Sequence, residues 1–307
     1  MIPSAGNRLV THVAAMVAYY AYASQTWNIA AGLCGQFSVT HVIWQGIAGY
    51  CTVAVSTVFG LPIWTGIILT IVITGLLSYL VGMASSKLLG LYFVMCTLAV
   101  NQMVNTVAIN WNYITGGNNG LGLNSRFAVY RDYLFYVFLA MAVAVFALFV
   151  WIRKSRFGSM MVAVRENELF AQSLGMNTAR VRMSAFMISS VLAGLGGYPF
   201  VLYTLMMHPS QLSATISMKV MVITMVGGIG TTLGPALGCI IAVLDEVIRM
   251  TIGAKFAPVA VIVYACVLIS MVMFKPRGLA SIKFFIPKQK PSVLKAETVS
   301  AVSGQRG

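Results

Sequence analysis

Long apolar runs dominate this sequence and decide what it can fold into. They lie at about residues 9–26, 28–58, 61–83, 88–109, 133–152, 184–206, 215–230, 232–252 and 257–274. Most have about the 20 residues that an α-helix needs to cross the hydrocarbon core of a bilayer. Only 8% of the residues are charged, against about 25% in soluble domains. The sequence therefore predicts an all-α, polytopic membrane protein with about 8–10 transmembrane helices.

Glycine-rich stretches interrupt two of the apolar runs. Run 28–58 contains "GLCGQFSVTH", and the region 215–252 contains "GGIGTTLGP". Irregular backbone is tolerated at membrane depth only where protein or water satisfies its polar groups. One Gly/Pro-broken element in each half of the chain is typical of a transport path. His41 follows the first break and is interpreted either as a structural histidine or as part of a polar path.

The basic residues predict the orientation. They give a net charge of +14 and gather in residues 153–182 and in the tail after Phe274. By the positive-inside rule, loop 153–183 and the C-terminus face the cytoplasm, with Lys87 on the same side. This clustering favours membrane topology over nucleic-acid binding. We expect a permease domain at 1–279 and a disordered basic tail at 280–307.

Parity then constrains the two broken elements. The loop at 110–132 lies outside, and region 215–252 begins and ends outside, as two crossings or as a re-entrant hairpin. In the first half, the side of the N-terminus is not determined by this rule. An N-terminus inside, weakly supported by Arg8, requires run 28–58 to start and end on one side. An N-terminus outside makes that run a single crossing.

The sequence carries no pattern typical of catalysis or metal binding. HExxH and GxSxG are missing, and "GGIGTTLGP" lacks the Gly-Lys-Ser/Thr ending of a phosphate loop. We therefore expect no catalytic residue, no metal and no cofactor in this chain, and a membrane-embedded enzyme is the least favoured class. Asp245 and Glu246 are interpreted either as a surface pair, with Arg249 four residues after Asp245, or as the ion site of a secondary carrier.

A polar island, "RENELFAQSLGMN" at 165–177, holds two of the six acidic residues. Its residues favour a helix, with Glu166 and Glu168 in the first turn and Gly175 as a left-handed stop. Three apolar side chains would form one edge of it: Val164, Leu169 and Leu174. We interpret the island either as a solvated loop helix or as a helix that docks on a cytoplasmic partner.

At these residues the chain resembles a known family. Arg165, Glu166 and Glu168, followed by Ala171, Leu174 and Gly175, resemble the E-x-x-A-x-x-x-G cytoplasmic loop of ABC importer permeases. The surrounding sequence is similar to the permeases of branched-chain amino acid (Leu/Ile/Val) uptake systems. Four further stretches agree in order: "GLCGQFSVTH", "GLYFVMCTLAV" running to "WNYITGGNNGL", "MVGGIGTTLGPALG" and "FKPRGL".

The resemblance implies a role for each matching stretch. The loop residues, from Arg165 to Gly175, would form the coupling helix that docks on an ABC ATPase subunit. Gln36 and Ser38 would lie at the first break, near the translocation path that His41 could also line. The remaining positions are Thr115, Gly116, Gly117 and Gly120 in an outer turn that meets a solute-binding protein, and Gly227, Gly228, Gly230, Gly234 and Pro235 at the second break.

It also implies an assembly and a membrane. The partners would be a second permease subunit, two ABC ATPase subunits that bind ATP and Mg, and an extracytoplasmic binding protein, in the lipid of a bacterial-type inner membrane. The substrate would be a branched-chain or related amino acid, or alternatively urea or a short amide. Three positions depart from the family pattern: Phe170 replaces a small residue, Asn119 an acidic one, and Lys219 stands where an acidic residue is common. Lys219 is interpreted as a snorkelling anchor or as a contact to an anionic group.

Overall fold

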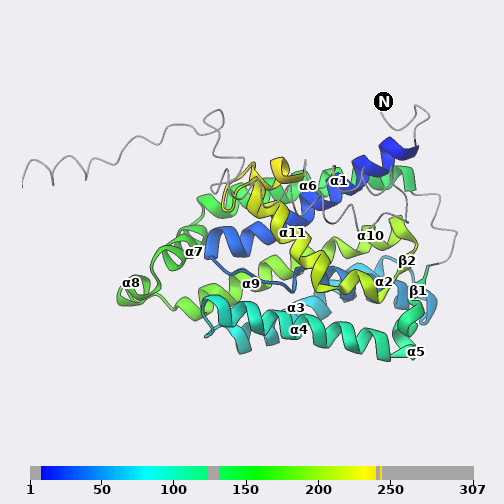
Figure 1. Cartoon of the computed structure of the whole chain (residues 1–307), viewed down its shortest axis with the longest axis horizontal. Helices are drawn as coiled ribbons and strands as arrows, with labels where there is room; N and C mark the ends of the chain where they lie inside the picture. Colours follow the sequence, from blue (N-terminus) through cyan, green and yellow to red (C-terminus); the bar gives the residue numbers. More distant parts are fainter. Residues whose placement is uncertain (1–7, 124–130, 240–242, 244–307) are drawn as a thin grey trace, which may run out of the picture.

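The computed structural model describes residues 8–123 and 131–239, together with residue 243. Helices make up almost all of this part (Figure 1). The α-helices are α1 (Arg8–Asn28), α2 (His41–Thr57), α3 (Thr65–Ser85), α4 (Gly90–Asn110), α5 (Asn112–Thr115), α6 (Arg131–Lys154), α7 (Arg156–Glu166), α8 (Glu168–Ser173), α9 (Thr178–Leu195), α10 (Gly197–Thr204) and α11 (Ala214–Gly227). The shorter elements are the π-helix η1 (Ile29–Leu33), the 3-10 helices η2 (Gly117–Asn119) and η4 (Pro209–Leu212), and the strands β1 (Leu121–Gly122) and β2 (Met206–Met207). The all-α prediction is confirmed.

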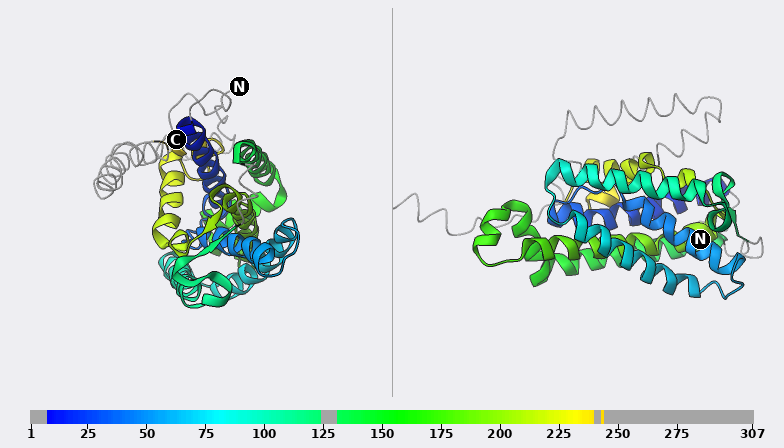
Figure 2. Two further views of the ribbon diagram at one scale, coloured as in Figure 1. Left: turned by 90° about the vertical axis from the view of Figure 1, so that its right-hand side faces the viewer. Right: turned by 90° about the horizontal axis from the view of Figure 1, so that it is seen from below.

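The long helices run along one common direction (Figure 2). Within the described residues, four stretches are long and apolar enough to cross a membrane: Thr65–Ser85, Gly90–Asn110, Tyr133–Lys154 and Thr178–Thr204. Helices α3, α4 and α6 expose large apolar side chains, such as Ile68 and Met103. Because such surfaces are unfavourable in water, they fit lipid or a partner. The chain is thus a multi-pass membrane protein, although segment 257–274 lies outside the described residues.

Helix α3 packs on α2 and α9, and every fully buried position on it carries a small side chain. Its buried positions are Gly66, Thr70, Thr74, Ser78, Gly82 and Ser85. They recur every three or four residues and therefore share one face of the helix. A Cβ added at Gly194 of α9 would lie 2.9 Å from a Thr74 side-chain atom. Small residues allow this close approach, which stabilises helix packing where no water drives it.

The two predicted loops lie at opposite ends of the bundle. Helices α7 and α8 stand at one end, and α5, β1 and β2 stand at the other (Figure 1). We call these the loop end and the cap end. Arg182 donates a hydrogen bond to the Leu88 carbonyl, so Lys87 lies at the loop end, as the charge pattern predicted.

The structure also resolves the alternative left open for run 28–58. Helix α1 begins at the cap end, where His12 Nδ1 lies 2.7 Å from the Tyr203 hydroxyl, and ends at the loop end (Figure 1). Run 28–58 therefore starts at the loop end and returns with α2 to the cap end. It is a single, broken crossing.

Candidate functional site

The first break is an extended stretch between η1 and α2. Polar side chains from other elements satisfy its backbone. Asn101 of α4 donates to the Val39 carbonyl at 3.0 Å, Thr97 accepts from the Val39 amide at 3.3 Å, and the Trp27 indole donates to the Ser38 carbonyl at 2.8 Å. A free backbone group here would be costly. The break is therefore a built feature of the interior.

The residues predicted at this break are buried together. Gln36, Ser38 and His41 are each less than 5% exposed. His41 Nε2 lies 2.7 Å from the Thr26 hydroxyl of α1, and the Ser38 hydroxyl lies 2.7 Å from that of Thr40. The break thus places several polar groups inside an apolar bundle.

The second break turns the chain back on itself. The chain leaves α11 at Gly228, and a helical stretch at 234–239 returns beside it. The two legs touch through backbone, because a Cβ added at Gly227 would lie 1.9 Å from the Gly234 carbonyl oxygen. The Thr231 hydroxyl accepts from the Gly234 amide at 3.0 Å and caps the returning leg, which contains Pro235. Gly230 adopts a positive φ of 73°, which suits glycine. The chain thus reverses direction at this break, as both predicted alternatives, two crossings or a re-entrant hairpin, require. The far end of the returning leg lies outside the described residues.

One asparagine joins the two breaks. Asn28, at the end of α1, is fully buried. Its Oδ1 accepts from the Gly230 amide at 2.8 Å, and its Nδ2 donates to the Thr231 carbonyl at 3.0 Å. Asn28 is not among the residues predicted from the sequence. The available signal was a lone amide at the junction of two apolar runs.

Arg165 reaches the same junction from the loop. Its Nη1 donates to the Gly32 carbonyl of η1, and a Cβ added at Gly230 would lie 3.0 Å from that nitrogen. Arg165 also bonds Glu166. The resemblance grouped Arg165 with residues that contact an ATPase, whereas its side chain faces the membrane bundle and contacts both breaks.

The predicted single loop helix is in fact two helices. Asn167 adopts an extended conformation, ends α7, and accepts from the Phe170 amide at 3.0 Å to cap α8. Glu166 is therefore the last residue of α7, so its expected place in a first turn is wrong. Glu168 does open α8. Gly175 has a φ of 81°, which confirms the left-handed stop.

The two faces of α8 differ. Ala171 and Val164 are buried, so Val164 does not form one edge with the exposed Leu169 and Leu174 as predicted. Glu168 faces the bundle and lies 3.5 Å from Arg182 of α9. The opposite face exposes three large apolar side chains: Leu169 at 78%, Phe170 at 61% and Leu174 at 63%. Exposed apolar groups on a loop helix are typical of a docking surface. We call these three residues the loop patch.

The outer turn is built from glycine conformations and closed by a two-stranded sheet. Gly116, Gly117 and Gly120 have positive φ angles. The Thr115 hydroxyl donates to the Ala108 carbonyl at 2.7 Å. Strand β1 then pairs with β2 at the cap end. These predicted residues shape the turn, and the side chains exposed on it include Trp111, Tyr113 and Asn119.

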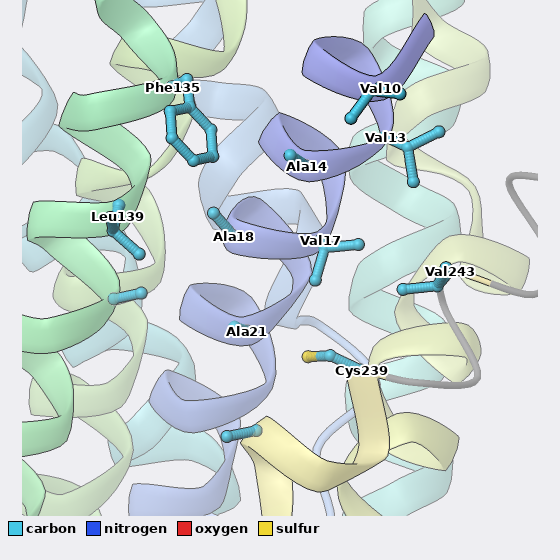
Figure 3. Close-up of a pocket in the computed structure, with 12 residues that line it drawn as sticks. Val10, Val13, Ala14, Val17, Ala18, Ala21, Phe135, Leu139, Cys239 and Val243 are labelled. Atoms are coloured by element: carbon cyan, nitrogen blue, oxygen red, sulfur yellow. The ribbon is translucent and has the colours of Figure 1, made fainter. Parts of the chain in front are cut away.

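One hollow on the bundle has an apolar lining that offers nothing to a polar substrate. It has a volume of about 580 Å³ and lies between α1, α6 and the three residues Ala236, Cys239 and Val243. Its lining side chains are apolar, including Val17, Leu139 and Cys239 (Figure 3). Lys219 is the third departure from the family pattern. It donates to the Tyr20 hydroxyl at 3.2 Å and lies over the Tyr20 ring. Its side chain therefore contacts α1, and its two predicted roles, a snorkelling anchor or a contact to an anionic group, stay predictions. Asp245 and Glu246 lie outside the described residues.

An all-α membrane bundle with two broken elements joined in its interior, and a loop contacting both, defines a membrane-transport subunit. The chain belongs to the branched-chain amino acid ABC transport permease family. The family described as "Branched-chain amino acid transport system / permease component" matches residues 9–273.

Three relatives agree with this assignment. The high-affinity branched-chain amino acid transport system permease protein LivM of Salmonella typhimurium is 25% identical over 297 residues, covering 87% of this chain and 69% of the relative. LivM of Escherichia coli K12 is 24% identical over 303 residues, covering 89% and 70%. A probable LivM of Methanocaldococcus jannaschii is 25% identical over 249 residues, covering 74% and 72%. No solved structure matches the chain.

Proposed function

We propose that this chain is a pore-forming subunit of an ABC importer that moves branched-chain or related amino acids into the cytoplasm. It would pair with a second permease subunit, two ATPase subunits that bind ATP and Mg, and an extracytoplasmic solute-binding protein. Loop 153–183 and the C-terminus would face the cytoplasm of an inner membrane. The chain itself would catalyse no reaction. The names of the relatives support the substrate class.

One observation carries the proposal: Arg165 connects the loop to both helix breaks. Arg165 lies in the last turn of α7, and a single residue, Asn167, separates α7 from α8. The loop patch at α8 is exposed and can bind a partner. A shift of α8 on that partner would pull Arg165 away from the Gly32 carbonyl and from Gly230. Arg165 and Asn28 both connect these two elements. Such a shift would remove the connection through Arg165 and so would loosen the junction. ATP-driven motion would thereby open the loop end of the path.

Reconstitution tests the proposal. Proteoliposomes holding the permease pair and the ATPases, with binding protein outside and ATP inside, should accumulate L-leucine. Uptake should stop when ATP or the ATPases are omitted. Uptake by this chain alone, driven by a Na⁺ or pH gradient, would instead support the secondary-carrier alternative at Asp245 and Glu246. Uptake of urea or short amides in place of leucine would change the substrate and keep the mechanism.

Arg165→Gln tests the connection within that system. The variant should still bind the ATPases, because the loop patch is unchanged, but uptake should fall at least tenfold. Arg153→Gln is the matched control, since Arg153 is exposed at the end of α6. Equal uptake by Arg165→Gln and wild type would contradict a role for Arg165 in coupling.

A further inference from the structure

Helix α4 contacts the rest of the bundle along one narrow face. Its buried residues are Phe93, Thr97, Asn101 and Ala108, and its other residues are at least partly exposed. These positions recur every four or seven residues and so share one face of the helix. The two in the middle, Thr97 and Asn101, are polar. The middle of α4 is therefore held by hydrogen bonds, which can break and form again.

These two polar residues hold the first break. The Thr97 hydroxyl accepts from the Val39 amide at 3.3 Å, and Asn101 Nδ2 donates to the Val39 carbonyl at 3.0 Å. The same nitrogen donates to the Ser217 hydroxyl of α11 at 3.3 Å. Asn101 is fully buried, and its Oδ1 has no hydrogen-bond partner among the residues that the structure describes. One amide thus connects α4 with the first break and with the helix that leads to the second.

The start of α4 is connected to α8. Arg182 of α9 donates from Nη1 to the carbonyl of Leu88, two residues before α4, at 3.3 Å. The same nitrogen lies 3.5 Å from Oε2 of Glu168 on α8. Arg182 is buried, and a buried guanidinium that loses its carboxylate is strongly unfavourable. We therefore expect Arg182 to follow Glu168 when α8 moves.

Helix α4 has a pivot at its first residue. Gly90 has a φ of 51°, and no atom lies within 4 Å of a Cβ added there. Glycine permits such a conformation and changes in it. Asn101 lies eleven residues further along the helix, or about 16 Å. A small tilt of α4 about Gly90 would therefore displace Asn101 enough to break its hydrogen bonds.

We propose that Arg182 and Asn101 are positioning residues of a second connection between the loop and the interior, with α4 as its moving part. We call this connection the α4 link. A shift of α8 would draw Arg182 and the Leu88 turn with it and tilt α4. Asn101 would then release Ser217 and the Val39 carbonyl, so the first break would lose its support. This inference rests on the proposed function, because the ATPase supplies the force on α8.

The number of leucine molecules taken up per ATP hydrolysed tests the α4 link in reconstituted complexes purified through the permease. A merely structural loss lowers both quantities together and leaves their ratio unchanged. Arg182→Met and Asn101→Leu should each lower the ratio at least fivefold, because the loop patch still binds the ATPase while the first break no longer responds. Arg180→Met and Gln102→Leu are the matched controls, since both residues are exposed neighbours, and they should keep the wild-type ratio.

Double variants separate the α4 link from the connection through Arg165. Arg182→Met combined with Asn101→Leu should lower the ratio no further than the more damaging single variant, because both interrupt one connection. Arg182→Met combined with Arg165→Gln should multiply the two separate fold-changes, because they interrupt different ones. Multiplication in the first pair, or its absence in the second, would contradict the α4 link as a separate connection.

Amide hydrogen exchange of the same complexes follows the first break directly. Residues 36–43 should exchange at least threefold faster with ATP than without it in wild type and in Arg180→Met, and this difference should disappear in Arg182→Met. If Arg182→Met or Asn101→Leu fails to fold, Ser217→Ala decides. It removes only one hydroxyl, which is a partner of Asn101, and should lower the ratio of uptake to hydrolysis at least twofold.

An unchanged ratio in Arg182→Met and Asn101→Leu would overturn the α4 link, and so would exchange at 36–43 that ATP does not change in wild type. Either result, together with ATP-dependent leucine uptake by the wild-type complex, would leave the proposed function standing. No ATP-dependent uptake by that complex would instead remove the proposed function and the α4 link with it.

Discussion

The two ends of the molecule are fastened to the bundle in different ways. At the cap end, backbone binds backbone: β1 pairs with β2, and the Leu123 amide donates to the Leu205 carbonyl at 2.8 Å. At the loop end, side chains make the contacts, through Arg165 and the Glu168–Arg182 pair. Close backbone contacts allow few alternative positions, whereas side-chain bonds can break and form again. The comparison indicates a fixed cap and a movable loop.

The largest expected effect is at the cap. Gly120→Ala should destabilise the protein by about 3 kcal/mol, because it combines a positive φ with steric overlap. Gly120 has a φ of 72°, and the new Cβ would lie 2.4 Å from the Met207 carbonyl oxygen. Denaturant unfolding in detergent measures the change. Gly122→Ala is the control two residues away, where an added Cβ meets no atom within 4 Å. Equal stability of the two variants would show that the cap is not rigid.

The loop patch should matter for partner binding and not for folding. Under the proposed function, Phe170→Asp should weaken binding to the ATPase subunit by about 2 kcal/mol, because an exposed aromatic anchor becomes a charge. The free energy of unfolding of the Phe170→Asp permease should change by less than about 0.5 kcal/mol, as is usual for exposed sites. Ser159→Asp, exposed on α7, adds the same charge and serves as the control. Wild-type affinity of Phe170→Asp would place the docking surface elsewhere.

Two neighbouring glutamates test which side chains hold the loop. Glu168→Gln should cost about 1–2 kcal/mol of stability, because its partner Arg182 is only 11% exposed and would lose its charge pairing. Glu166→Gln should cost less than about 0.5 kcal/mol, since Glu166 is 66% exposed. Thermal unfolding of the two variants side by side gives the difference. A larger loss for Glu166→Gln would reverse the assignment of the two carboxylates.

Sequence patterns predicted the helices and their interruptions well because the bilayer imposes strong local rules. A helix must be long and apolar to cross, so runs such as 61–83 and 88–109 correspond closely to α3 and α4. Glycine permits the conformations of a break, so both breaks and the stop at Gly175 were also visible.

Contacts between distant residues were not predictable in the same way. Asn28 and Gly230 are 202 residues apart, and Arg165 and Gly32 are 133 apart. No local pattern indicates which carbonyl a guanidinium will reach, so Arg165 was expected to face a partner. Asn167 split the island for a related reason. Its side chain offered the backbone a cap that competes with a continuous helix.

A fourth prediction, at Gly175, sharpens the comparison between the ends. Gly175 shares a positive φ with Gly120, but no atom lies within 4 Å of a Cβ added there. Gly175→Ala should therefore cost about 1 kcal/mol, which is the conformational term alone. Because the turn positions α8 against α9, uptake should fall by more than the fraction of unfolded protein alone would explain. Measuring uptake and unfolding on one preparation separates the loss of transport from the loss of stability. A loss of stability as large as that of Gly120→Ala would mean that the loop is held as rigidly as the cap, and the distinction between a fixed and a movable end would then fail.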